Sequence, residues 1–101
     1  MAAYVIVETD ITDPEAYEGY KAASPGAVAA GGGRFLVRGG ELDVLEGDWT
    51  PPRLVILEFE DLAVARRWYD SETYRQARAL REGAARIRMV AVQGVDSPPG
   101  T

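Results

Sequence analysis

The 101-residue sequence contains neither cysteine nor histidine. Without cysteine, disulfides, thiolate catalysis and cysteine-based zinc or iron–sulfur sites are excluded. Without histidine, the commonest metal ligand, the usual axial ligand of haem and the usual general base near neutral pH are missing. Any chemistry must therefore use other groups, and we predict no cofactor and no metal site.

Long apolar runs and an excess of positive charge are also missing. No run approaches the roughly 20 apolar residues that a membrane-spanning helix needs, and the N-terminus has no basic segment followed by an apolar stretch. We therefore expect a cytoplasmic protein. Sixteen acidic residues against eleven basic ones leave a formal charge of −5, which disfavours nucleic acid and anionic membranes as partners. The arginines between Arg66 and Arg88 recur at helical spacing, which is typical of a solvated helix face.

The chain length and the 47% hydrophobic content are those of one globular domain. We expect this domain to cover residues 1–95, followed by a flexible tail over residues 96–101. A domain of this size buries only a modest core, so a second copy of the chain is a natural way to cover further apolar surface.

Four short segments carry the patterns of β-strands. Residues 4–7 and 54–57 are unbroken apolar runs, typical of strands that are covered on both faces. Residues 35–37 form another strand, which ends at a glycine pair. Residues 86–91 place Ile, Met and Ala at alternate positions, as expected for a strand with one face less well covered.

Two helical regions separate these strands. Thr12 and Glu15 form a capping box that predicts the start of the first helix, and the glycines at 31–33 predict its end. The Ser24-Pro25 pair is expected to kink or restart this helix. Asp61 is the expected cap of the second region, which Asp70-Ser71 interrupts.

The resulting order, βαββαβ with a fully apolar first and third strand, predicts an α+β ferredoxin-like fold. In its antiparallel sheet, with strand order 4-1-3-2, the first and third strands are central. The helices cover only one face of such a sheet, yet the central strands are apolar on both faces. We therefore expect a homodimer in which a second sheet packs against the first.

The sequence resembles the family called domain of unknown function 1330, a branch of the dimeric α+β barrel superfamily. The resemblance spans Tyr4 to Gly94 and rests on Arg38-Gly39-Gly40, Glu46-Gly47-Asp48-Trp49, Arg53, Glu58-Phe59, and Trp68-Tyr69-Asp70-Ser71 with Tyr74. It implies a homodimer whose two sheets face each other, with a small cleft in each subunit between sheet, helices and connecting loop. Superfamily relatives include cofactor-independent monooxygenases, lactone isomerases and haem-dependent enzymes, so the resemblance implies no single reaction.

Glu58 is the candidate catalytic residue. It follows an apolar strand, where a carboxyl group is suited to acid or base chemistry. A structural interpretation competes with this one. If Arg38 pairs opposite Leu54, then Arg34 lies opposite Glu58 on the same face, and a cross-strand ion pair explains both residues.

Arg38 and Arg53, on either side of the connecting loop, are the candidate anion-binding residues. A guanidinium group beside a cleft can bind the oxygens of a carboxylate or an enolate. Glu41 or Glu46 could pair with them instead. Trp49 lies in the same loop and is either a lid over a pocket or a plug against the partner subunit.

Ser71 and Tyr74 complete the set of candidate substrate-binding residues. Ser71 is also the expected N-cap of the helical piece that carries Tyr74, and no histidine or Gly-x-Ser-x-Gly motif supports it as a nucleophile. Trp68 and Tyr69 are expected to pack in the core. Tyrosine hydroxyls, including those of Tyr17, Tyr20 and Tyr74, could line the cleft, although aromatic core packing also explains these residues.

Three functions are compatible with this set, and whether the protein is an enzyme stays open. The first is a homodimer that binds a small acidic or aromatic molecule. As an enzyme it would transfer a proton or isomerise an organic acid, with Glu58 as base and an arginine stabilising negative charge. The second is a non-catalytic dimeric module whose polar residues are structural. The third is a cofactor-free monooxygenase.

Overall fold

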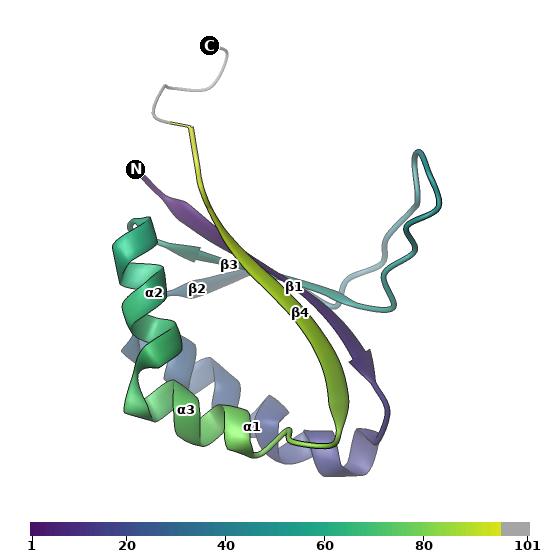
Figure 1. Ribbon diagram of the computed structural model, residues 1–101, viewed down its shortest axis with the longest axis horizontal. Coiled ribbons are helices and arrows are strands. Elements are labelled where there is room, and N and C mark those ends of the chain that lie inside the picture. The colour runs from purple at the N-terminus through teal and green to yellow at the C-terminus, as the bar shows by residue number, and fades with distance from the viewer. Residues whose placement is uncertain (96–101) are drawn as a thin grey trace.

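The two unbroken apolar runs of the sequence become the two central strands of one antiparallel sheet. We describe the fold from a computed structural model, which describes residues 1–95; the predicted tail lies outside these residues. Strands β1 (Ala3–Ile11) and β3 (Leu54–Phe59) are central, and β2 (Arg34–Arg38) and β4 (Ala85–Gln93) form the edges. The strand order β2-β3-β1-β4 is the predicted order 4-1-3-2 counted from the opposite edge, so the predicted α+β ferredoxin-like fold is confirmed (Figure 1).

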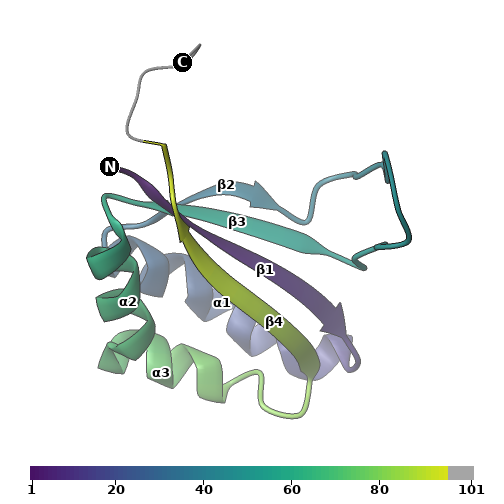
Figure 2. The same cartoon turned by 45° about the horizontal axis from the view of Figure 1, so that its top comes forward.

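Three helices cover one face of this sheet. They are α1 (Pro14–Ala30), α2 (Leu62–Asp70) and α3 (Glu72–Ala79), and Figures 1 and 2 show all three on the same side. Within residues 1–95, no helix is long and apolar enough to cross a membrane.

The side chains of the sheet alternate between a packed face and an open face. On the packed face, Val5 and Val7 of β1 pair with Leu57 and Val55 of β3 and join the helices in the core. The face without helices, which we call the open face, carries the alternate residues, Tyr4, Ile6, Glu8, Leu54, Ile56, Glu58, Arg88, Val90 and Val92. Most of these are partly exposed and apolar, so this face remains uncovered in a single chain.

The first helix begins one residue later than expected. Asp13, not Thr12, is its N-cap, and the Asp13 carboxylate accepts a hydrogen bond from the backbone N–H of Ala16 at 3.1 Å. The reason is Pro14, which occupies the first helical turn and disfavours helical backbone angles in the residue before it. The helix then continues through Pro25 to Ala30, so the expected restart at this proline is wrong.

The turn between α1 and β2 needs glycine because aromatic rings pack against its backbone. A Cβ atom on Gly31 would lie 2.5 Å from Cδ1 of Trp68, and one on Gly33 would lie 2.5 Å from Cε1 of Phe59. Gly31 also caps α1, as the glycine run predicted. These close approaches pack the turn after α1 against Trp68 of α2 and Phe59 of β3.

The connection from β2 to β3, residues 39–53, forms an arm without helix or strand. Figure 2 shows it reaching away from the end of the sheet. Leu45 in the arm is 94% exposed. The base of the arm returns to the sheet where the N–H of Thr9 donates to the carbonyl of Arg53 at 2.9 Å.

Candidate functional site

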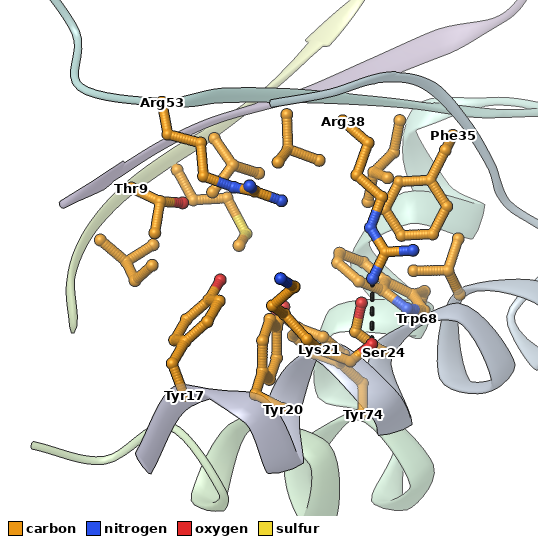
Figure 3. Close-up of a pocket in the computed structure, with 16 residues that line it drawn as sticks. Thr9, Tyr17, Tyr20, Lys21, Ser24, Phe35, Arg38, Arg53, Trp68 and Tyr74 are labelled. Carbon is orange, nitrogen blue, oxygen red and sulfur yellow. Dashed lines mark hydrogen bonds between the residues drawn. The ribbon is translucent and has the colours of Figure 1, made fainter. Parts of the chain in front are cut away.

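A small cavity lies between the packed face of the sheet and the helices (Figure 3). Its volume is about 30 Å³, which is room for about two water molecules or the head group of a small acid. The polar residues that line it are Thr9, Tyr17, Tyr20, Lys21, Ser24, Arg38, Arg53, Trp68 and Tyr74. Its apolar lining includes Val7, Val28, Phe35, Val55, Leu57, Ile87 and Met89.

Arg53 enters the cavity from the sheet because its backbone extends the ladder between β1 and β3 by one residue. Its side chain therefore points to the same face as that of Val55, two residues later. The guanidinium group lies against Gly39, where a Cβ atom would come within 2.5 Å of Nη1. The Nε atom of Arg53 is buried and has no hydrogen-bond partner among the described residues.

Arg38 reaches the same cavity through a β-bulge in β2. Arg34 pairs with Glu58, as predicted, but the register shifts after Phe35, and Arg38 pairs with Val55. The prediction that Arg38 lies opposite Leu54, on the face of Arg34, is therefore wrong. A bulge inserts one residue, and one residue moves every later side chain to the other face.

The two guanidinium groups face the cavity without a carboxylate partner. In Figure 3 both side chains enter the cavity from the sheet, Arg53 above Tyr17 and Tyr20, and Arg38 toward the Lys21 carbonyl. Ion pairs within residues 1–95 join Lys21 to Glu18, Arg34 to Glu58 and Arg88 to Glu8. None of them involves Arg38 or Arg53, so the alternative pairing with Glu41 or Glu46 does not occur.

The charge that lines the cavity is all positive. Lys21, Arg38 and Arg53 contribute cations, and no aspartate or glutamate of the described residues lines it. Nor do three carboxylates gather anywhere in residues 1–95 where they could hold a metal ion. A buried donor without an acceptor is costly, so the buried Nε atom of Arg53 and the surrounding positive charge favour an anion with oxygen acceptors.

Two tyrosines close the cavity on the helix side. The hydroxyl groups of Tyr20 and Tyr74 are 2.8 Å apart, and Nη2 of Arg81 donates to the Tyr74 hydroxyl at 3.3 Å. Burial raises the pKa of Tyr20 far above its usual value. Burial also raises the pKa of Tyr17, although the charge of Arg53 partly offsets this effect. The phenols of Tyr17 and Tyr20 stay protonated near neutral pH and serve as hydrogen-bond donors rather than bases.

Glu58 lies on the other side of the sheet from the cavity. It is on the open face, and its Oε1 atom is 2.6 Å from Nε of Arg34. The structure therefore supports the ion-pair interpretation of Glu58. The predicted grouping of Glu58 with Arg38 and Arg53 in one cleft is wrong, because the bulge separates the faces of Arg34 and Arg38.

Ser71 and Trp49 also lie outside the cavity. Ser71 caps α3, as predicted, because its hydroxyl accepts a hydrogen bond from the N–H of Tyr74 at 3.1 Å. The indole N–H of Trp49 donates to Glu8 at 3.3 Å, which places Trp49 at the open face. Of the six predicted site residues, the structure brings together Arg38, Arg53 and Tyr74.

Sequence reasoning missed three polar residues that line the cavity, Thr9, Lys21 and Ser24. The spacing of α1 contained a signal for Ser24, since it follows Tyr17 by seven residues and falls on the same helix face. Trp68 is buried as predicted and also lines the cavity. Tyr69 is 38% exposed, so its predicted core position is wrong.

The fold resembles several solved structures. A protein of unknown function from Rhodopseudomonas palustris has a TM-score of 0.72 and 19% identity, over 95% of this chain and 84% of that one. A dimeric ferredoxin-like protein of unknown function from Jannaschia sp. has a TM-score of 0.66 and 15% identity, over 93% of this chain and 100% of that one.

A third similar structure is SnoaB, a cofactor-independent oxygenase from Streptomyces nogalater. Its TM-score is 0.63 and its identity 12%, over 97% of each chain. At such identities, the likeness shows a shared fold alone. A search of curated proteins found no match. A family model matches residues 2–95, and the chain accordingly belongs to the family described as domain of unknown function, DUF1330.

Proposed function

We propose that the protein binds a small organic acid and holds its carboxylate between Arg38 and Arg53. The observation that carries this proposal is the pair of guanidinium groups in one cavity that no carboxylate of residues 1–95 lines. A ligand carboxylate would supply the acceptor that Nε of Arg53 lacks. Each hydrogen bond to a charged group contributes about 1.5–3 kcal/mol.

The size and walls of the cavity limit the acid. About 30 Å³ accepts the carboxylate but little more. Arg53 is half-buried and Arg38 is exposed, so the organic part of the ligand would extend past Arg38. Phe35 and Trp68 offer aromatic surface for this part. We therefore favour a small monocarboxylate, with an apolar or aromatic group next to the acid.

Binding fits this cavity better than proton abstraction does. The cavity is lined by no carboxylate of the described residues, the chain contains no histidine, and the phenols of Tyr17 and Tyr20 stay protonated. A general base is therefore missing from the lining. The proton-transfer reaction with Glu58 as base has no support in this geometry.

Cofactor-free oxygenation is a second candidate. In that chemistry the substrate anion itself reacts with oxygen, and cationic groups stabilise the anion. Arg38 and Arg53 beside the aromatic walls would suit an enolate or phenolate, and SnoaB shares the fold. Oxygen consumption with a panel of phenols and 1,3-diketones tests this candidate. If the wild-type protein consumes no more oxygen than the Arg53→Met variant, this candidate function is contradicted.

We also propose that two copies of the chain pair through their open faces. Val90 is 59% exposed, Val92 47% and Trp49 53%, all on the side without helices. A contiguous apolar surface of this kind is typical of an interface. Similar structures from Jannaschia sp. and Bacteroides fragilis are described as dimeric, which supports the proposal. The cavity would then lie on the outer layer of each subunit, away from the interface.

A thermal-shift panel tests the binding proposal, because a ligand that binds only the folded state raises its melting temperature. The panel contains formate, acetate and benzoate, and the matching uncharged amides, at constant ionic strength. The carboxylates should stabilise the protein, and the amides should not. Arg38→Met should weaken the response, and Arg53→Met should abolish it. Arg34→Met is the matched control, since Arg34 is exposed on the opposite face. Equal responses to acids and amides, or unchanged responses in the Arg38 and Arg53 variants, would contradict the proposal.

A further inference from the structure

The carbonyl group of Lys21 has lost its partner within α1. In an α-helix, a carbonyl accepts a hydrogen bond from the N–H group four residues later. Four residues after Lys21 stands Pro25, which lies inside the helix and has no N–H. The proline therefore leaves a free acceptor on the helix face that lines the cavity.

Arg38 donates a hydrogen bond to this carbonyl. Its Nη2 atom donates to the Lys21 carbonyl at 2.9 Å, the bond that is dashed in Figure 3. The Arg38 guanidinium group also stands 4.7 Å from the centre of the Phe35 ring. The hydrogen bond thus ties the end of β2 to the middle of α1 across the cavity.

We infer that Pro25 is a positioning residue for ligand binding, which acts by freeing the Lys21 carbonyl to hold Arg38. This inference rests on the proposed function. A guanidinium group has five N–H donors, and the carbonyl uses one of them, so four remain for a ligand carboxylate. Arg38 is exposed, and a long exposed side chain without such a hydrogen bond samples many rotamers. Holding it in place before binding lowers the entropy that binding costs.

Helix stability alone does not account for Pro25. Proline is the least favourable residue in a helix interior, and Ala would restore the missing hydrogen bond. The surrounding helix is rich in alanine, with Ala22, Ala23 and Ala27 within three residues. A role outside the helix explains why the less stable residue stands there.

The direct test is Pro25→Ala, with acetate as the probe and dissociation constants from NMR titration. The N–H introduced at position 25 would bond to the Lys21 carbonyl and weaken its hold on Arg38 by competition. We expect acetate affinity to fall about three- to tenfold, the range expected for immobilising one long side chain, while the melting temperature stays equal or rises. A merely structural role of Pro25 would make the variant lose stability together with affinity. A positioning role predicts a loss of affinity without a loss of stability.

Gly26→Ala is the matched control. Gly26 is the next residue of the same helix, is exposed, and has open space where a Cβ atom would be built. This substitution should raise helix stability and leave acetate affinity unchanged. An ester bond in place of the amide at position 25, with an alanine side chain, removes the N–H again and should restore the wild-type affinity.

A double-mutant cycle separates Pro25 from other effects. In an Arg38→Met background, Pro25→Ala should cause no further loss, because the residue through which it acts is gone. If the wild-type protein binds acetate and the Pro25→Ala variant binds it equally well, this inference is overturned and the proposed function stands. An equal loss in the Arg38→Met background would have the same consequence. A wild-type protein that does not bind acetate would overturn the proposed function, and this inference with it.

Discussion

Replacing Gly39 with alanine should weaken carboxylate binding through the displacement of Arg53. Gly39 has a φ angle of +71°, and its backbone touches the guanidinium group of Arg53. A Cβ atom built there would lie 2.5 Å from Nη1 and 2.8 Å from Cζ of Arg53. Since carbon atoms do not approach so closely, the Arg53 side chain must move away from its place in the cavity.

The substitution has two effects of different kinds. The left-handed backbone angle costs a residue with a Cβ atom about 1–2 kcal/mol of folding stability. The loss of the Arg53 hydrogen bonds to a carboxylate costs a further ~1.5–3 kcal/mol of binding free energy. At about 1.4 kcal/mol for each factor of ten, acetate should bind roughly ten- to a hundredfold more weakly.

Two measurements on matched variants separate these effects. Urea denaturation reports the stability, and NMR titration with acetate reports the affinity. Gly47→Ala is the control for backbone strain, because Gly47 has a φ angle of +86° and no atom within 4 Å of a built Cβ. It should lose stability and keep its affinity. Wild-type acetate affinity in Gly39→Ala, or an equal loss of affinity in Gly47→Ala, would contradict the displacement of Arg53.

Three further predictions concern Glu58, the interface and pH. Glu58→Gln breaks the exposed ion pair with Arg34, so urea denaturation should show a loss under about 1 kcal/mol, with acetate affinity unchanged; a tenfold loss of affinity would return Glu58 to the site. Trp49→Ala should raise the dimer dissociation constant in sedimentation velocity, whereas a monomeric wild-type protein would refute a shared interface. Burial raises the pKa of Tyr20 above the ordinary value of 10.0, so the unfolded chain loses this proton first as the pH rises. Stability should therefore fall above about pH 10, by up to ~1.4 kcal/mol per pH unit for this group, and less steeply in Tyr20→Phe when followed by urea denaturation.

The fold was predictable because burial of the central strands is visible in the sequence. Residues 4–7 and 54–57 are apolar at every position, and this pattern is typical of the two central strands of a four-stranded sheet. The caps Asp61 and Ser71 were predictable for a similar local reason, since each hydroxyl or carboxylate binds the N–H three residues later. Thr12 was a wrong prediction because Pro14 constrains its neighbour more strongly than the capping-box pattern does.

The site was predictable only in part because its geometry depends on tertiary structure. The structure brings three of the predicted residues, Arg38, Arg53 and Tyr74, to one cavity, but the bulge that turns Arg38 inward has no local pattern in β2. Nor could alternation reveal the face of Arg53, since the run after it is apolar throughout. The bond from Arg38 to the Lys21 carbonyl joins residues 17 positions apart and could not be predicted from either segment alone.

The two tryptophans offer the most direct test of the central claim, that a carboxylate binds between Arg38 and Arg53. The indole N–H of Trp68 is buried beside the cavity and has no partner within residues 1–95, whereas that of Trp49 lies at the open face. An acetate titration that follows both indole signals by ¹⁵N NMR therefore compares the two faces in one sample. The Trp68 signal should shift and saturate while the Trp49 signal stays fixed, and Arg53→Met should abolish the shift. A response at Trp49 alone, or no response at either indole, would contradict carboxylate binding in this cavity.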